Sequence, residues 1–203
     1  MAELLLFCAL VALLELDTTY IGQFMFSRPL ITGSILGYVT GNFFLGLQLG
    51  VFLELIYLDF IPIGGAVPPS GAVSAGTAVL MVYFFGLPAY FAFFAGIISG
   101  ILFSVIERRI RAMRGRILLT AELEITEGSF TPGLLIAQNL FFQFLVVFTF
   151  MLIMLTMAGP LAAYADNHAP DKLRIAFQFS YFVVPWIGMA VLFISFSTKP
   201  KTD

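Results

Sequence analysis

Eight polar side chains are scattered through a largely apolar stretch of the chain, and they define the chemistry that this stretch can support. They are Asp17, Gln23, Arg28, Asn42, Gln48, Glu54, Asp59 and Ser70. Carboxylates accept hydrogen bonds from hydroxyl groups, amides both donate and accept, and arginine donates without changing its protonation state. This mixture suits a neutral, polyhydroxylated ligand better than it suits an ion.

Other kinds of chemistry lack the residues that they need. The sequence has no G-x-x-x-x-G-K-[ST] motif, no C-x-x-C pair and a single histidine, so it predicts no P-loop nucleotide site, no metal site and no cofactor. It also lacks the clustered carboxylates or histidines of an enzyme that acts alone, so we do not expect the chain to be catalytic on its own. The net charge of −2 gives no indication of nucleic acid binding.

Arg28 and Glu54 are charged groups in apolar surroundings. They are separated by 25 residues without a charge, and Glu54 stands alone in the sequence LELIYL. A charge inside a membrane is costly unless it has a partner or a function. Two interpretations therefore stay open: the two residues form a buried pair that holds helices together, or they belong to a ligand site.

The sequence IPIGGAVPPSGA, which follows Phe60, interrupts the helical pattern. Pro68 and Pro69 cannot donate helical hydrogen bonds, and the glycines favour other backbone conformations. Irregular backbone at membrane depth is tolerated where protein or water satisfies its polar groups, as at the substrate sites of transporters. We expect a re-entrant or broken segment near residues 60–86, ended by a turn at Gly86-Leu87-Pro88.

The elements that position these residues are membrane helices. Apolar residues make up 60% of the 203 residues and charged residues 11%, whereas a soluble domain is about half apolar and a quarter charged. The long charge-free runs predict an all-α, polytopic integral membrane protein with six to seven apolar segments, and residues 1–203 are expected to form a single membrane domain. Gly33, Gly37 and Gly41 recur every four residues, which favours close helix packing over substrate contact.

Five arginines between Arg108 and Arg116 indicate the orientation of the chain. By the positive-inside rule they place an Arg/Glu-rich loop, about residues 107–131, on the cytoplasmic side. A second loop, about residues 159–174, is then external, and the tail with Lys199 and Lys201 is cytoplasmic. His168 lies in the external loop, on the wrong side of the membrane for a phosphoryl carrier.

Four sequence motifs, in this order, resemble the IIC membrane subunit of the mannose-fructose-sorbose group of the bacterial phosphotransferase system. They are the sequence F-S-R-P-L at 26–30, G-x-x-x-G-N at 37–42, G-x-x-L-E-L at 50–55 and G-x-x-x-P-P at 64–69. The likeness covers roughly residues 17–80. It implies a multi-pass protein of the bacterial cytoplasmic membrane that binds and translocates a hexose-type sugar. It also implies an oligomer that works with a IID membrane subunit and with soluble IIA and IIB phosphocarriers, which supply the phosphohistidines for sugar phosphorylation.

Carried over to this chain, the resemblance implies that Gln23, Arg28 and Glu54 contribute to the sugar site, with the turn at Gly64–Gly71 as its wall. Asn42 and Ser70 complete the expected substrate-binding set, although the family commonly has aspartate at both positions. Two alternatives stay open. One is a reduced, non-transporting regulatory IIC-like subunit, and the other is the substrate-capture subunit of an energy-coupling-factor vitamin transporter.

Overall fold

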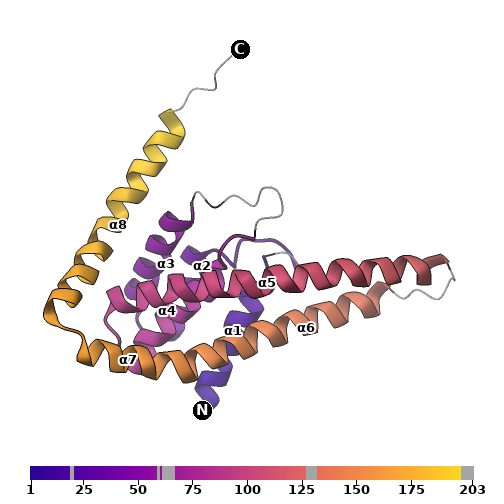
Figure 1. The fold of residues 1–203 in the computed structure, drawn as a ribbon, viewed down its shortest axis with the longest axis horizontal. Coiled ribbons are helices and arrows are strands. Elements are labelled where there is room, and N and C mark those ends of the chain that lie inside the picture. Colours follow the sequence, from indigo (N-terminus) through magenta and orange to yellow (C-terminus); the bar gives the residue numbers. More distant parts are fainter. Residues whose placement is uncertain (19–20, 59, 61–66, 127–131, 198–203) are drawn as a thin grey trace.

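The computed structural model describes residues 1–18, 21–58, 60, 67–126 and 132–197, and the elements found there are helical (Figure 1). In chain order they are α1 (Ala2–Leu16), α2 (Pro29–Val39), α3 (Phe43–Tyr57), α4 (Gly71–Phe85), α5 (Ala89–Thr126), α6 (Pro132–Ile153), a π-helical turn (Met154–Ala158), α7 (Gly159–His168) and α8 (Asp171–Ser197). The expected all-α class is confirmed.

Three stretches of the described residues are long and apolar enough to cross a membrane. They are Ala89–Gly115, Gly133–His168 and Asp171–Ile194, whereas α2, α3 and α4 are shorter apolar helices. An α-helix needs about 20 apolar residues to span the hydrocarbon core. The chain is therefore a multi-pass membrane protein in which long spans accompany several short helices.

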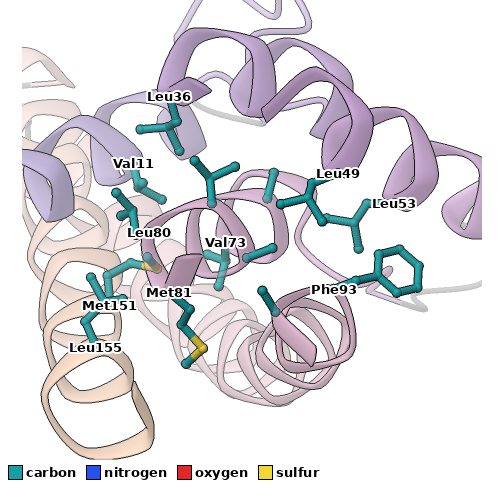
Figure 2. Close-up of a cluster of buried hydrophobic side chains, with 14 of the residues drawn as sticks. Val11, Leu36, Leu49, Leu53, Val73, Leu80, Met81, Phe93, Met151 and Leu155 are labelled. Carbon is teal, nitrogen blue, oxygen red and sulfur yellow. The ribbon is translucent and has the colours of Figure 1, made fainter. Parts of the chain in front are cut away.

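The short helix α4 lies at the centre of the bundle. All its residues from Ala72 to Met81 are buried, because it packs against α1, α2, α3, α5 and α6. Figure 2 shows Leu80 and Met81 among side chains from these neighbours. Many of the α4 residues are alanine, serine, glycine or threonine, which let helix backbones approach closely. The N-terminus of α4 is thereby fixed deep inside the protein.

Glycines bring α2 and α3 into close contact. A Cβ added to Gly33 would lie 2.5 Å from the Gly46 carbonyl oxygen, and one added to Gly37 would lie 2.9 Å from the Gly46 Cα. Gly41 lies in the turn between the helices with φ +78°, where a Cβ would meet nothing within 4 Å. The predicted packing role is therefore correct for Gly33 and Gly37, whereas Gly41 makes the turn between the two helices.

Two segments expected to be loops are helical instead. Residues 107–126 continue α5 without a break, residues 159–168 form α7, and α8 begins at Asp171. Arginine, glutamate and leucine are strong helix formers, so charge ends the membrane span without ending the helix. Residues 127–131 lie outside the described part of the chain, and the sidedness of both segments remains a prediction.

The expected turn at residues 86–88 is present. Gly86 ends α4 in the left-handed conformation with φ +64°, and α5 begins at Ala89. Before α4, residues 67–70 are non-helical, as expected for a broken segment. Residues 61–66, which include Gly64 and Gly65 of this segment, lie outside the described residues.

Candidate functional site

A cavity of about 390 Å³ lies where the ends of α1, α2, α3 and α4 meet the side of α5. This volume falls within the range of about 300–1,000 Å³ that is typical of small-molecule sites. Its lining consists of Glu15, Asp17, Thr18, Gln23, Met25, Ser27, Arg28, Pro29, Tyr57, Phe60, Val67, Pro68, Pro69, Ser70, Gly71, Phe103, Ser104, Glu107 and Arg111.

Three of the five residues predicted to bind substrate line this cavity. They are Gln23 and Arg28, which both lie in the connection between α1 and α2, and Ser70 at the start of α4. The non-helical residues Val67, Pro68 and Pro69 form part of the wall, as the break in the helical pattern indicated. Asn42 and Glu54 do not line the cavity.

Glu54 lies behind Arg28 rather than in the cavity wall. Arg28 Nη1 donates to Glu54 Oε1 at 3.1 Å, and Leu30 N donates to Glu54 Oε2 at 3.5 Å. Since the first N–H groups of a helix lack partners within it, a carboxylate at the start of α2 is favourable. The side chains are 59% and 26% exposed, so this pair joins α2 to α3 without being fully buried. Arg28 thus pairs with Glu54 between the two helices and also lines the cavity, and its part in a ligand site stays a prediction.

Asn42 caps a helix instead of binding in the cavity. It lies in the turn before α3, where its side-chain oxygen accepts a hydrogen bond from Leu45 N at 3.4 Å. An asparagine immediately before an apolar helical run is a common N-cap, so this local signal could have indicated the role. Asn42 thus lies outside the cavity lining, and its part in substrate binding stays a prediction.

Ser70 connects the ends of α1 and α4 to the middle of α5. As the N-cap of α4 it accepts from Val73 N at 3.1 Å, and its hydroxyl donates to Glu15 Oε2 at 2.7 Å. Its own N–H donates to the Gly100 carbonyl oxygen of α5 at 3.3 Å. Ser70 therefore ties α4 to α1 and α5 at the edge of the cavity.

The same network extends to α3 through Ser74. The Ser74 hydroxyl lies 2.7 Å from both the Ser70 carbonyl oxygen, to which it donates, and the Tyr57 hydroxyl. A Cβ on Gly100 would clash with the Ser74 hydroxyl and would lie 3.0 Å from the Tyr57 hydroxyl. Glycine at position 100 therefore lets α5 approach this network closely.

A second buried network borders the cavity on the α5 side. Glu107 Oε1 accepts from Arg111 Nε at 2.9 Å, and Glu107 Oε2 accepts from Gln143 Nε2 of α6 at 2.9 Å. Gln143 Oε1 in turn accepts from Arg114 Nη2 at 2.7 Å. Gln143 thus joins α6 to α5 by hydrogen bonds.

Sequence reasoning did not assign Glu15, Asp17, Glu107 or Arg111 to the site. Asp17 was counted only among the polar side chains of the apolar stretch, and Glu107 and Arg111 only as part of the charged segment that indicates the orientation of the chain. The spacing of four residues between Glu107 and Arg111 indicates a helical ion pair. No local pattern, however, shows that the end of α1 and the middle of α5 line the same cavity.

The cavity contains charged side chains that already have partners, and it also contains neutral hydrogen-bonding groups. Among the residues that the structure describes, no group of three or more histidine, cysteine, aspartate or glutamate side chains is placed to hold a metal ion. Glu107 faces Arg111, and Arg28 faces Glu54. The arrangement suits a polar, uncharged ligand that is bound by hydrogen bonds.

Helices of this kind around a polar cavity define a polytopic membrane protein with a cavity inside its bundle. The family model described as the phosphotransferase system sorbose-specific IIC component matches residues 1–200. The chain therefore belongs to this IIC family, and the family resemblance predicted from its sequence motifs is confirmed.

Individual relatives agree with this assignment. The mannose-specific EIIC components of Escherichia coli strain K12 and of Shigella flexneri are 37% identical over 60 residues, which are 30% of this chain and 23% of each relative. The aligned stretch thus covers less than a quarter of those proteins.

Two solved structures share the fold. One, titled "Structure of membrane protein", matches with a TM-score of 0.71, and a cryo-EM structure of the mannose transporter ManYZ with microcin E492 matches with a TM-score of 0.59. Each match is 19% identical and covers 98% of this chain and 81% of the other. At this identity, the likeness concerns the fold alone.

Proposed function

We propose that this chain is the sugar-binding IIC permease subunit of a phosphotransferase system, and that its cavity holds a hexose-type sugar as it crosses the membrane. The observation that carries the proposal is the cavity itself, because Gln23 and Arg28 from the connection between α1 and α2 meet Ser70 from the start of α4 there. Membership of the IIC family supplies the class of protein, and the cavity supplies a place for the ligand.

The cavity matches the chemistry of a hexose. Sugar hydroxyls donate to carboxylates and accept from arginine and amide groups, and groups of these kinds are present in Glu15, Arg28 and Gln23. A volume of about 390 Å³ accommodates a monosaccharide together with water. Because the charged side chains already have partners, a neutral ligand can bind without leaving an unpaired charge.

The proposed partners are a IID membrane subunit and soluble IIA and IIB phosphocarriers, in the cytoplasmic membrane of a bacterium. A solved structure with the same fold is titled as the mannose transporter ManYZ, which supports a second membrane subunit. The single histidine, His168, is exposed and does not line the cavity. Its ring contacts the ring and the backbone carbonyl oxygen of Tyr164 in the same helix. Phosphoryl transfer to the sugar would therefore use histidines of the partner proteins.

Of the alternatives, a vitamin-capturing subunit conflicts with membership of the IIC family. A non-transporting regulatory subunit was suggested by Asn42 and Ser70, where the family commonly has aspartate. Asn42 lies outside the cavity, so its neutral side chain removes no carboxylate from it. Ser70 donates to the buried Glu15, and a carboxylate at position 70 would instead face another carboxylate. Both residues are therefore compatible with an active site.

The proposal is tested by hexose uptake in a bacterium that lacks its own hexose carriers and expresses this chain with its IID, IIA and IIB partners. We expect uptake of at least one labelled hexose, and its loss in Gln23→Ala and Arg28→Ala at an unchanged amount of protein in the membrane. Gln48→Ala is the matched control, because Gln48 is an exposed amide of α3 outside the cavity.

Two outcomes would contradict the proposal. One is wild-type uptake rates in both cavity variants, which would place the sugar elsewhere. The other is binding of soluble IIB to membranes with no uptake of any hexose and no sugar phosphate, which would instead support the regulatory subunit.

A further inference from the structure

The segment from Gly22 to Ser27, here called the wall segment, connects α1 to α2 and has an unusual backbone. Gln23 has φ +55° and Met25 has φ +69°, and both residues line the cavity. Residues other than glycine rarely adopt this left-handed conformation, and it persists where surrounding contacts hold it in place. The wall segment therefore needs an anchor.

Asp17 provides that anchor. Its Oδ1 accepts a hydrogen bond from Phe24 N at 2.8 Å and its Oδ2 accepts one from Phe26 N at 2.6 Å, so the carboxylate holds the backbone on both sides of Met25. On the α2 side, the Thr32 hydroxyl donates to the Phe26 carbonyl oxygen at 2.8 Å. The wall segment is thus fixed to α1 and to α2.

The position of Asp17 has no favourable explanation within α1 itself. Asp17 is the C-cap residue of this helix, where the helix dipole disfavours a negative charge. It is also buried, which is costly for a carboxylate without donors. The two N–H groups of the wall segment offset both costs, because hydrogen bonds to a charged acceptor are among the strongest in proteins.

We propose that Asp17 is a positioning residue that clamps the wall segment and thereby presents Gln23 and Met25 to the ligand, setting the sugar selectivity of the cavity. The part that concerns sugar rests on the proposed function, whereas the clamp can be measured without any sugar. Asparagine keeps one acceptor oxygen and alanine keeps none. The expected order of disturbance is therefore Asp17→Ala, then Asp17→Asn, then wild type.

The clamp is tested by spin labelling of Met25→Cys in membranes. Met25 is 62% exposed, and the single native cysteine, Cys8, is buried, so the label reports on the wall segment. Met113→Cys on α5 is the matched control, because Met113 is 61% exposed and far along the chain from the clamp.

We expect Asp17→Ala to increase the ratio of mobile to ordered label at position 25 by at least about tenfold, since one hydrogen bond to a charged group is worth about that factor. The spectrum at position 113 stays the same. Equal spectra at position 25 with and without Asp17→Ala would overturn the clamp.

Selectivity is tested by the KM for uptake of a panel of hexoses. We expect Asp17→Asn to raise the KM by about tenfold for the preferred hexose and less for the others, so that discrimination among sugars narrows. Asp171→Asn, at the exposed start of α8, is the matched control and keeps the wild-type KM.

The two proposals fail in different ways. If Asp17→Ala releases the label while Asp17→Asn and Asp17→Ala keep the wild-type KM for every hexose, the selectivity role of Asp17 is wrong and the proposed function stands. If the wild type takes up no hexose, the proposed function and the selectivity role both fail, and the labelling still decides whether Asp17 holds the wall segment.

Discussion

A methyl group added at Gly50 should disturb the site from outside it. Gly50 lies on α3 against the start of α2, where a Cβ would be 2.5 Å from the Pro29 carbonyl oxygen and 3.1 Å from the Leu30 Cα. Both obstacles are backbone atoms, which cannot rotate away. Since ordinary Cβ contacts begin near 3.4 Å, α2 would have to move by about 1 Å.

The effect of Gly50→Ala on stability and uptake can be estimated from the overpacking and from the residues at the start of α2. Overpacking of this kind costs roughly 1–3 kcal/mol of folding free energy. The start of α2 also holds Arg28 and Pro29, both of which line the cavity. Misplacing a site group by about 1 Å can reduce activity by up to about 100-fold. We therefore expect Gly50→Ala to lower both thermal stability and the rate of sugar uptake.

The measurements are the melting midpoint of the detergent-purified protein and the kcat/KM of hexose uptake. Gly115→Ala is the control, because a Cβ at Gly115 on α5 meets nothing within 4 Å. Alanine favours a helix by about 1 kcal/mol over glycine, so this control should be at least as stable as the wild type. Wild-type stability and uptake in Gly50→Ala would show that the contact between α2 and α3 is looser than the structure indicates, and would refute the reasoning.

Three further substitutions separate stability from sugar binding. Ser70→Ala removes the N-cap of α4 and the donor to Glu15, so we expect a loss of about 1–3 kcal/mol in denaturant unfolding together with weaker hexose uptake. Tyr57→Phe removes the hydrogen bond to Ser74 and should lower the unfolding free energy by about 0.5–1.5 kcal/mol; an unchanged value would show that this bond contributes nothing. Asn42→Ala removes the cap of α3 and should cost about 1 kcal/mol while leaving the KM for hexose unchanged, and a raised KM would return Asn42 to the site.

The hydropathy of the sequence predicted the all-α membrane class, because a segment that crosses lipid must be apolar. The ends of the helices were less predictable, because lipid does not determine where a helix ends. The turn at Gly86 was found because glycine readily adopts the left-handed conformation required there. Residues 107–126 were expected to form part of a loop, yet they extend α5. Charge marks where a helix leaves the membrane, and backbone propensity decides how far it continues.

The lining of the cavity was predicted only in part, because the sequence shows which residues are polar but not how distant helices pack. Arg28 and Ser70 stood out because each is a polar residue in an apolar run. Glu107 was interpreted only as part of the charged segment that indicates the orientation of the chain. Its place beside the cavity depends on how α5 packs against α4, which no local pattern shows. Asn42 was grouped with the cavity residues although it lies outside the lining, because capping and ligand binding use the same residue types.

The cavity has a balance of charge that favours a neutral cargo. The first residues of α2 and α4, Pro29 and Gly71, line it, so the positive ends of two helix dipoles face the carboxylates that also line it. Asp17 and Glu107 each use both oxygens on N–H donors of the protein. A charged ligand would compete with these contacts, whereas a sugar adds hydrogen bonds to them. The paired charges therefore preserve the shape of the cavity, and we expect neutral groups between them, such as the Gln23 amide, to bind the ligand.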